Sequence, residues 1–240
     1  MANFLQKLKN GFLSLLFPDV TRCVSCGKEL KTGYLCKDCV KEFYLNNSHR
    51  CEWCSRPTVS VDDVICEQCK MSGNLFEYAR SPLIYKGEVL VLIRKFKYKE
   101  RRDLGGFFAK YMLEEYEKLP SVDIILPVPM WKEKYRDRLY SSAEELTKKL
   151  CELVEREYRV DIVEKVRDTG TQTKLSGEER KLNVKGCFKV INSKEVKDKT
   201  ILIIDDVYTT GATVNELTRV LKAKKARAVY VLTAAIAKRG

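Results

Sequence analysis

Hydrophobic and polar positions follow two distinct periods along residues 76–240. Runs of consecutive apolar residues indicate strands buried on both faces, whereas apolar residues three or four positions apart indicate amphipathic helices. The predicted strands are residues 83–85, 122–128, 200–204 and 228–236, and the predicted helices are residues 88–98, 104–119, 141–158 and 212–224. Because strands that alternate with helices usually pair in parallel, we expect an α/β domain with a mostly parallel sheet and flanking helices.

The first 75 residues follow a different pattern and predict two further parts. Apolar residues recur at helical spacing from Phe4 to Leu16, and Pro18 ends the series, which predicts an amphipathic helix over residues 1–19. We interpret it as a helix that packs on a neighbouring domain, with contact to a membrane surface as the alternative. A cysteine-rich domain follows over residues 20–73, and the third domain begins at Phe76.

Eight of the ten cysteines form four C-x-x-C pairs. They are Cys23 and Cys26, Cys36 and Cys39, Cys51 and Cys54, and Cys66 and Cys69. Two such pairs supply the four thiolates of a tetrahedral zinc site, so four pairs predict two sites. A disulfide framework and a redox motif are the alternatives, but no export signal is present and redox C-x-x-C motifs usually occur singly.

Spacers of nine, eleven and eleven residues separate the pairs. Each spacer is long enough for a short hairpin, so the simplest assignment joins the first two pairs in one zinc ribbon and the last two in another, with an interleaved arrangement as the alternative. Four sulfur ligands leave no open position for a catalytic water, so we expect both zinc ions to be structural. The only histidine, His49, is interpreted as a surface or turn residue.

The chain has 240 residues and a formal charge of +12, and its basic residues are unevenly distributed. Residues 1–80 hold 11 basic and 9 acidic side chains, whereas residues 81–240 hold 34 and 24. A basic surface favours phosphate-rich partners, although it also serves solubility. The sequence shows neither the roughly 18 to 20 apolar residues that a spanning helix needs nor an export signal, so we expect a cytoplasmic protein without a membrane span.

The most specific motif is ILIIDDVYTTGAT at residues 201–213. A buried strand leads into Asp205 and Asp206, and a short loop with Gly211 then leads into a helix. Backbone N–H groups at a helix N-terminus bind phosphate, and hydroxyl residues next to them add donors. Carboxylates before such a loop can accept hydrogen bonds from ribose hydroxyls, so the motif predicts a pocket for a sugar 5′-phosphate.

This motif resembles the 5-phosphoribosyl-1-pyrophosphate (PRPP) loop of type I phosphoribosyltransferases. Together with the four C-x-x-C pairs, it makes nearly the whole chain similar to the ComF family of competence proteins, of the ComFC type. Residues 126–130, LPVPM, and residues 166–183 match further family segments. One departure is clear, because the family usually continues with R-x-R-G-F-N-Q where this chain has Arg136, Asp137, Arg138, Leu139, Tyr140, Ser141 and Ser142.

The resemblance implies a role for each matching residue. Asp205 and Asp206 would hold the ribose hydroxyls and, indirectly, Mg²⁺ that accompanies PRPP. The 5′-phosphate would lie in the loop, and the pyrophosphate would face the segment after the second strand and the basic residues beyond it. The residues implied for the phosphate groups are Val207, Tyr208, Thr209, Thr210, Gly211, Ala212, Thr213, Val128, Arg136, Arg138 and Gln172.

Two functions follow from the resemblance. In the first, the pocket binds PRPP or a ribose 5-phosphate group and the protein takes part in uptake of single-stranded DNA, with a helicase or another DNA-processing protein as a partner. In the second, it is an active phosphoribosyltransferase with an unknown acceptor. Aromatic and basic residues alternate in one segment, which consists of Arg94, Lys95, Phe96, Lys97, Tyr98 and Lys99. This pattern favours binding of single-stranded DNA through base stacking, although Phe96 would face the core if the segment is helical.

Overall fold

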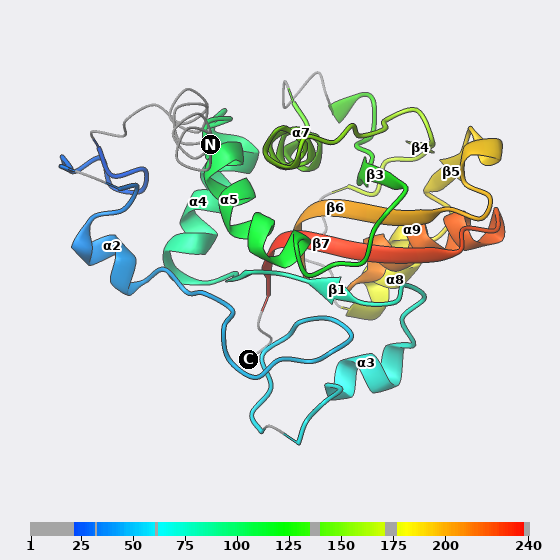
Figure 1. Ribbon diagram of the computed structural model, residues 1–240, viewed down its shortest axis with the longest axis horizontal. Coiled ribbons are helices and arrows are strands. Elements are labelled where there is room, and N and C mark those ends of the chain that lie inside the picture. Colours follow the sequence, from blue (N-terminus) through cyan, green and yellow to red (C-terminus); the bar gives the residue numbers. More distant parts are fainter. Residues whose placement is uncertain (1–21, 32, 61, 135–139, 171–176, 238–240) are drawn as a thin grey trace, which may run out of the picture.

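The computed structural model describes residues 22–31, 33–60, 62–134, 140–170 and 177–237 (Figure 1). Its centre is a parallel sheet in the order β3 (Ile124–Pro127), β6 (Thr200–Tyr208) and β7 (Ala228–Ile236), with β1 (Ala79–Arg80) and β2 (Leu83–Ile84) both paired to the outer edge of β7. The carboxyl ends of β6 and β3 meet at one edge, because Pro127 pairs with Ile204. The predicted parallel sheet with flanking helices is therefore confirmed.

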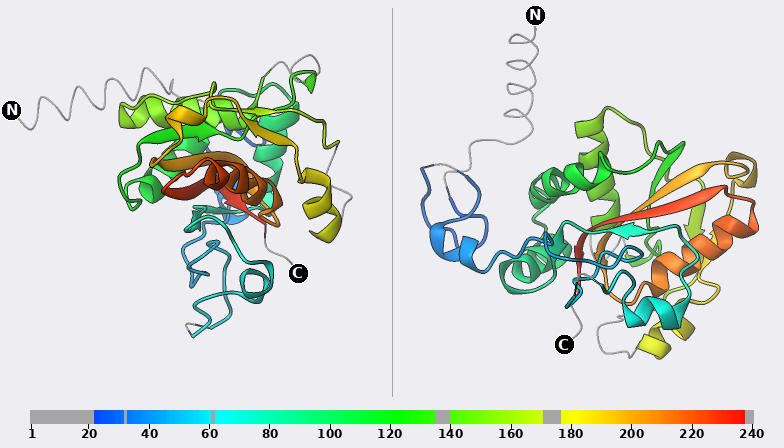
Figure 2. Two further views of the ribbon diagram at one scale, coloured as in Figure 1. Left: turned by 90° about the vertical axis from the view of Figure 1, so that its right-hand side faces the viewer. Right: turned by 60° about the horizontal axis from the view of Figure 1, so that its bottom comes forward.

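Helices cover both faces of the sheet (Figures 1 and 2). On one face, α5 (Leu104–Tyr116) and α7 (Ser142–Val154) pack on Leu202 and Ile204, and α4 (Gly87–Tyr98) joins the same core. On the other face, α9 (Ala212–Ala223) packs on Ile201 and Ile203. Successive β6 residues thus enter opposite cores, as the run of consecutive apolar residues requires.

A second, antiparallel sheet lies beside α9. It consists of β4 (Val163–Lys165) and β5 (Phe188–Val190), and α8 (Gly177–Val184) and the short 3₁₀ helix η2 (Ser193–Glu195) flank β5 in the chain. The pattern of apolar residues does not predict this sheet, because strands of three residues are too short to show a period. None of the helices in the described ranges has the length and apolar character needed to cross a bilayer.

Several element ends differ from the prediction for local reasons. The helix predicted over residues 141–158 ends at Val154, because Glu155 takes a left-handed φ of 52°. The strand predicted to end at residue 204 continues to Tyr208, because Val207 and Tyr208 keep their pairing with β7. The predicted N-terminal helix over residues 1–19 lies outside the described residues.

The two cysteine-rich units dock at different places. The first, which contains α2 (Lys37–Lys41), lies against α4 and α5, where Tyr34 and Phe43 contact Phe107 with ring centroids 5.3 and 5.7 Å apart. The second, which contains α3 (Glu67–Ser72), lies on the other side of the sheet from α7 and beside β1, where Ala79 N donates to Trp53 O at 2.7 Å (Figures 1 and 2).

Candidate functional site: two cysteine centres and a phosphate loop

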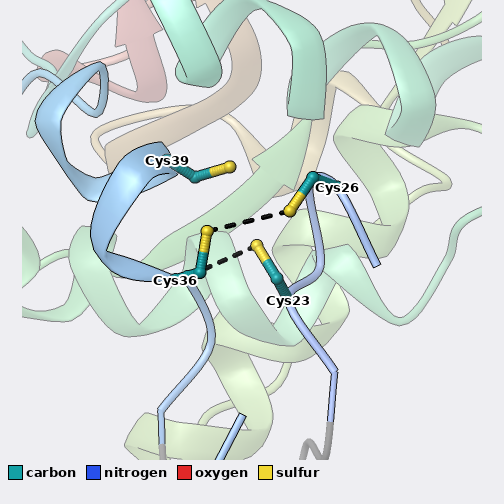
Figure 3. A group of neighbouring side chains, drawn as sticks. All are labelled: Cys23, Cys26, Cys36 and Cys39. Atoms are coloured by element: carbon teal, nitrogen blue, oxygen red, sulfur yellow. Dashed lines mark hydrogen bonds between the residues drawn. The ribbon is translucent and has the colours of Figure 1, made fainter. Parts of the chain in front are cut away.

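Eight cysteines converge in two groups of four. Within each group the four sulfurs lie within 4.8 Å of one another, and the groups are Cys23, Cys26, Cys36 and Cys39, and Cys51, Cys54, Cys66 and Cys69. Figure 3 shows the first group, with Cys26 Sγ 3.7 Å from Cys36 Sγ and Cys36 N donating to Cys23 Sγ at 3.4 Å. The sequential assignment is therefore confirmed over the interleaved one, and exposed His49 belongs to neither group.

Both groups are built in the same way. A tight turn carries the first pair, and the second pair lies at the N-terminus of a short helix, with Cys36 before α2 and Cys66 before α3. Each turn requires a left-handed residue directly after its second cysteine, and Gly27 takes a φ of 79° there. Ser55 occupies the equivalent position at 66°, and its strain is balanced by burial and by the Asn46 Nδ2 group, which donates to Ser55 O at 2.7 Å.

The electrostatics of the second group require a cation. The thiol of Cys54 donates to Cys51, which lowers the pKa of Cys51 and raises the pKa of Cys54 well above its ordinary value. Four sulfurs this close, three of them buried, cannot all ionise without a positive ion between them, and Zn²⁺ binds four thiolates at about 2.3 Å. The donor set therefore fits zinc.

The phosphate loop lies at the carboxyl end of β6, where α9 begins. Gly211 is the residue before α9 and has a φ of 78°, and a Cβ atom at this position would lie 2.3 Å from the hydroxyl oxygen of Tyr208. Glycine is therefore required both for its left-handed backbone and for its lack of a side chain. Ala212 N donates to Thr210 Oγ1 at 3.3 Å, whereas the N–H groups of Thr213 and Val214 have no partner within the helix and point toward an anion at this end.

The two acids at the end of β6 have different surroundings. Asp206 is 5% exposed, and it accepts hydrogen bonds from Lys97 Nζ at 2.7 Å and from Ser142 Oγ at 2.5 Å. Asp205 is half-buried and has no cation this close among the described contacts, although its carboxylate accepts from Asp206 N at 2.8 Å. Burial and the charge of Asp206 together raise the pKa of Asp205 from 3.8 to about 7. Asp206 is thus held by α4 and α7, whereas Asp205 faces the pocket.

An open pocket brings these parts together. Asp205, Thr209 and Thr213 line it together with Val128, which follows β3. Cationic side chains from distant parts of the chain also line it, and these are Arg94, Lys97, Lys134, Lys165 and Arg180. Burial lowers the pKa of Lys165, which donates to Thr169 Oγ1 at 2.8 Å.

The predicted site residues fall into four groups. Asp205, Asp206, Val207, Thr209, Thr213 and Val128 line the pocket, whereas Tyr208 and Thr210 are buried beneath the loop and 4% and 5% exposed. Gly211 and Ala212 form the start of α9. Arg136, Arg138 and Gln172 lie outside the described residues. Lys97, Ser142 and Lys165 were not predicted for this pocket, and no local sequence pattern distinguishes them.

The strip of residues 94–99, which was predicted to bind DNA, lies mostly in α4, and this helix determines which of its side chains reach solvent. Phe96 is fully buried in the core beneath α4, so its ring cannot stack on a base, and that part of the prediction is wrong. Lys97 pairs with Asp206, and Lys95 Nζ donates to the carbonyl of Ser25 in the first cysteine unit. The exposed members of the strip are Arg94, Tyr98 and Lys99.

Comparisons with known proteins agree with both parts of the chain. Residues 12–70 match the double zinc ribbon domain family, and residues 140–240 match the phosphoribosyl transferase domain family. Among solved structures, a glutamine PRPP amidotransferase from B. subtilis covers 59% of this chain with 18% identity and a TM-score of 0.40, and the match spans 30% of that protein. A hypoxanthine phosphoribosyltransferase from Staphylococcus aureus covers 55% of this chain and 62% of its own, with 16% identity and a TM-score of 0.34.

Three curated relatives match over most of their length. Competence protein F of Haemophilus influenzae is 27% identical over 207 residues, which is 83% of each chain. DNA utilization protein YhgH of Escherichia coli K12 is 27% identical and covers 82% of this chain and 94% of its own. Competence protein ComFC of Streptococcus pneumoniae is 25% identical and covers 87% and 96%. The chain therefore carries a double zinc ribbon domain followed by a phosphoribosyl transferase domain, and over most of its length it is similar to competence proteins F and ComFC.

Proposed function

We propose that the pocket at the carboxyl end of β6 binds PRPP or another ligand with a ribose 5-phosphate group. The observation that carries this proposal is the position of Asp205, which lines the same pocket as Thr209 and Thr213 at the start of α9. Helix N–H groups and threonine hydroxyls would hold the 5′-phosphate, and the Asp205 carboxylate would accept from ribose hydroxyls. Asp206 would contribute only indirectly, because its carboxylate already accepts hydrogen bonds from Lys97 and Ser142.

Mg²⁺ suits the same place. Asp205 carries a pKa raised by burial and by the neighbouring Asp206 charge, so a cation brought by the ligand would stabilise its ionised form. The ion would neutralise the pyrophosphate group when PRPP is bound. Lys134 and Lys165 line the same pocket and would add positive charge to it.

Calorimetric titration of PRPP, with and without Mg²⁺, tests the proposal. We expect Mg²⁺-dependent binding to the wild type and a loss of at least tenfold in affinity in Asp205→Asn, as expected for removal of a charged hydrogen-bond acceptor. Asp63→Asn, in an exposed loop of the second ribbon, is the matched control and should bind like the wild type. Equal affinity in Asp205→Asn and the control would refute the assignment.

The process that this pocket serves is proposed from the relatives, whose names refer to competence and to DNA utilization. We propose that the protein takes part in handling single-stranded DNA, with the exposed residues Arg94 and Tyr98 of α4 and Lys99 directly after it as the contact. The variant Arg94→Glu/Lys99→Glu tests this contact, and PRPP titration of the same variant shows whether the pocket, which Arg94 also lines, is affected. In the wild type, binding of a single-stranded oligonucleotide should weaken steeply as the salt concentration rises, and the variant should not bind it. If the variant still binds the oligonucleotide, α4 is excluded as the contact.

Catalytic turnover and a protein partner in DNA uptake stay predictions. Turnover would appear as pyrophosphate release from PRPP that requires a defined acceptor.

A further inference from the structure

The two cysteine units contain equivalent turns, and a different residue follows the left-handed position in each. In the first unit Lys28 follows Gly27, and in the second Arg56 follows Ser55. The backbone is the same at both places, because Cys23 N donates to Lys28 O and Cys51 N donates to Arg56 O, each at 2.7 Å. The Lys28 side chain is 66% exposed and pairs with Asp38, whereas Arg56 is 8% exposed.

Arg56 is buried because it reaches into the ends of the central strands. Its Nη2 donates to Thr209 O at 2.8 Å, and its Nη1 donates to Ala237 O. One guanidinium therefore joins the first residue after β6 to the first residue after β7. A planar guanidinium with several fixed donors can hold two carbonyls at once, which a single ammonium does less well.

Other residues of the second unit contact the same loop. Gln68 of α3 donates to Thr210 O at 3.5 Å. Just after this unit in the chain, Phe76 packs edge-on against Tyr208 with ring centroids 6.2 Å apart, and the Tyr208 hydroxyl lies directly beneath Gly211. Cys51, Cys54 and Cys69 belong to the same buried cluster as Tyr208 and Ala212, whereas Cys23, Cys36 and Cys39 of the first unit form a separate cluster.

A second connection reaches α9. Asn74 Nδ2 donates to Cys69 Sγ at 3.2 Å, and its side-chain oxygen accepts from Asn215 Nδ2 at 3.4 Å. Asn215 Oδ1 in turn accepts from Leu75 N at 2.9 Å. The first turn of α9 is thereby linked to a cysteine of the second centre through one side chain.

We infer that the second zinc ribbon holds the phosphate loop in its binding conformation, with Arg56 as the positioning residue, while the first ribbon has no such role. The inference rests on the proposed function for its effect on ligand affinity. Its effect on the loop does not depend on any ligand. A loop that is ordered in advance binds more tightly because less conformational freedom is lost on binding.

Two measurements on the full-length protein test this inference. Amide hydrogen exchange of residues 207–214 reports the order of the loop, and titration with PRPP and Mg²⁺ reports its binding. We expect Arg56→Ala to speed exchange in the loop and to weaken PRPP binding, each about tenfold, since two charge-assisted hydrogen bonds are lost. Arg56→Lys should give an intermediate result, and Lys28→Ala, at the matched position, should behave like the wild type in both measurements.

Zinc content and the urea unfolding midpoint are measured for every variant, so that a general loss of folding is recognised. With two zinc ions still bound, unchanged loop exchange in both Arg56 variants would overturn the inference, as would equal effects of Arg56→Ala and Lys28→Ala. Should Arg56→Ala fail to fold, Arg56→Lys decides by the same criteria. If the wild type binds no PRPP, the proposed function fails, and hydrogen exchange alone still decides whether Arg56 orders the loop.

Discussion

The unfavourable position of Asp205 predicts that its removal stabilises the protein. Its carboxyl is half-buried beside the charge of Asp206, and its pKa rises from 3.8 to about 7 in the folded state. A carboxyl whose pKa is higher in the folded protein favours folding less as it ionises, so stability falls as the pH rises from about 4 to above 7. Asp205→Asn removes this charge and should raise the free energy of unfolding.

The pKa sets the size of the effect. A shift from 3.8 to about 7 corresponds to at most about 4 kcal/mol at pH 8, less than about 2 kcal/mol at pH 5, and close to zero at about pH 3. Because solvent reaches part of the carboxyl, we expect about 1 to 2 kcal/mol at pH 8 and less than half of that at pH 5.

Urea unfolding of the wild type, Asp205→Asn and the control Asp63→Asn at pH 8 and pH 5 measures this difference. The expected result is a midpoint that rises in Asp205→Asn at pH 8, rises less at pH 5, and stays unchanged in the control. Destabilisation by Asp205→Asn, or an equal gain at both pH values, would refute the reasoning. Together with the expected loss of PRPP binding, a gain in stability would show that this carboxylate is kept for its ligand.

Three other predictions follow from the same contacts. Metal analysis of the purified protein should find two zinc ions per chain, and chelation should release the first ribbon's ion sooner, since Cys26 is exposed whereas Cys66, the least buried cysteine of the second group, is half-buried. Gly211→Ala should abolish PRPP binding and lower stability by at least about 1 to 2 kcal/mol, measured by calorimetry and urea unfolding, because it combines a left-handed backbone with a clash against Tyr208. Lys97→Met should destabilise the protein by about 3 to 5 kcal/mol in urea unfolding, because it leaves buried Asp206 without its cation, and Lys97→Met/Asp206→Asn should recover part of the loss.

The sequence predicted those features that local chemistry determines. The C-x-x-C pairs indicated two four-cysteine sites because their ligands lie close in the chain, and the apolar run before Asp205 indicated a strand buried on both faces. The loop with Gly211 was recognised because glycine and the helix start belong to one short motif.

The features that the sequence did not reveal depend on contacts between distant segments. Lys97 was predicted to bind DNA, and only the packing of α4 brings its ammonium to Asp206, 109 residues away. Arg56 reaches Thr209 across 153 residues, and no pattern around either residue predicts that contact. Phe96 could have faced either way on a helix, and the aromatic core with Phe108 and Tyr140 determined its direction.

The order of the strands has a consequence for synthesis of the chain. β1 pairs with β7 through Ala79 and Val231, so the edge strand next to the second ribbon obtains its partner only after residues 228–236 have been synthesised. The ribbons can bind metal from neighbouring residues well before that moment, whereas the sheet must wait. During this interval the apolar side of the second ribbon, which later lies against β6 and β7, is open to other chains or to chaperones. A deletion that removes β7 would therefore leave β1, β2 and the second ribbon without their partner strand.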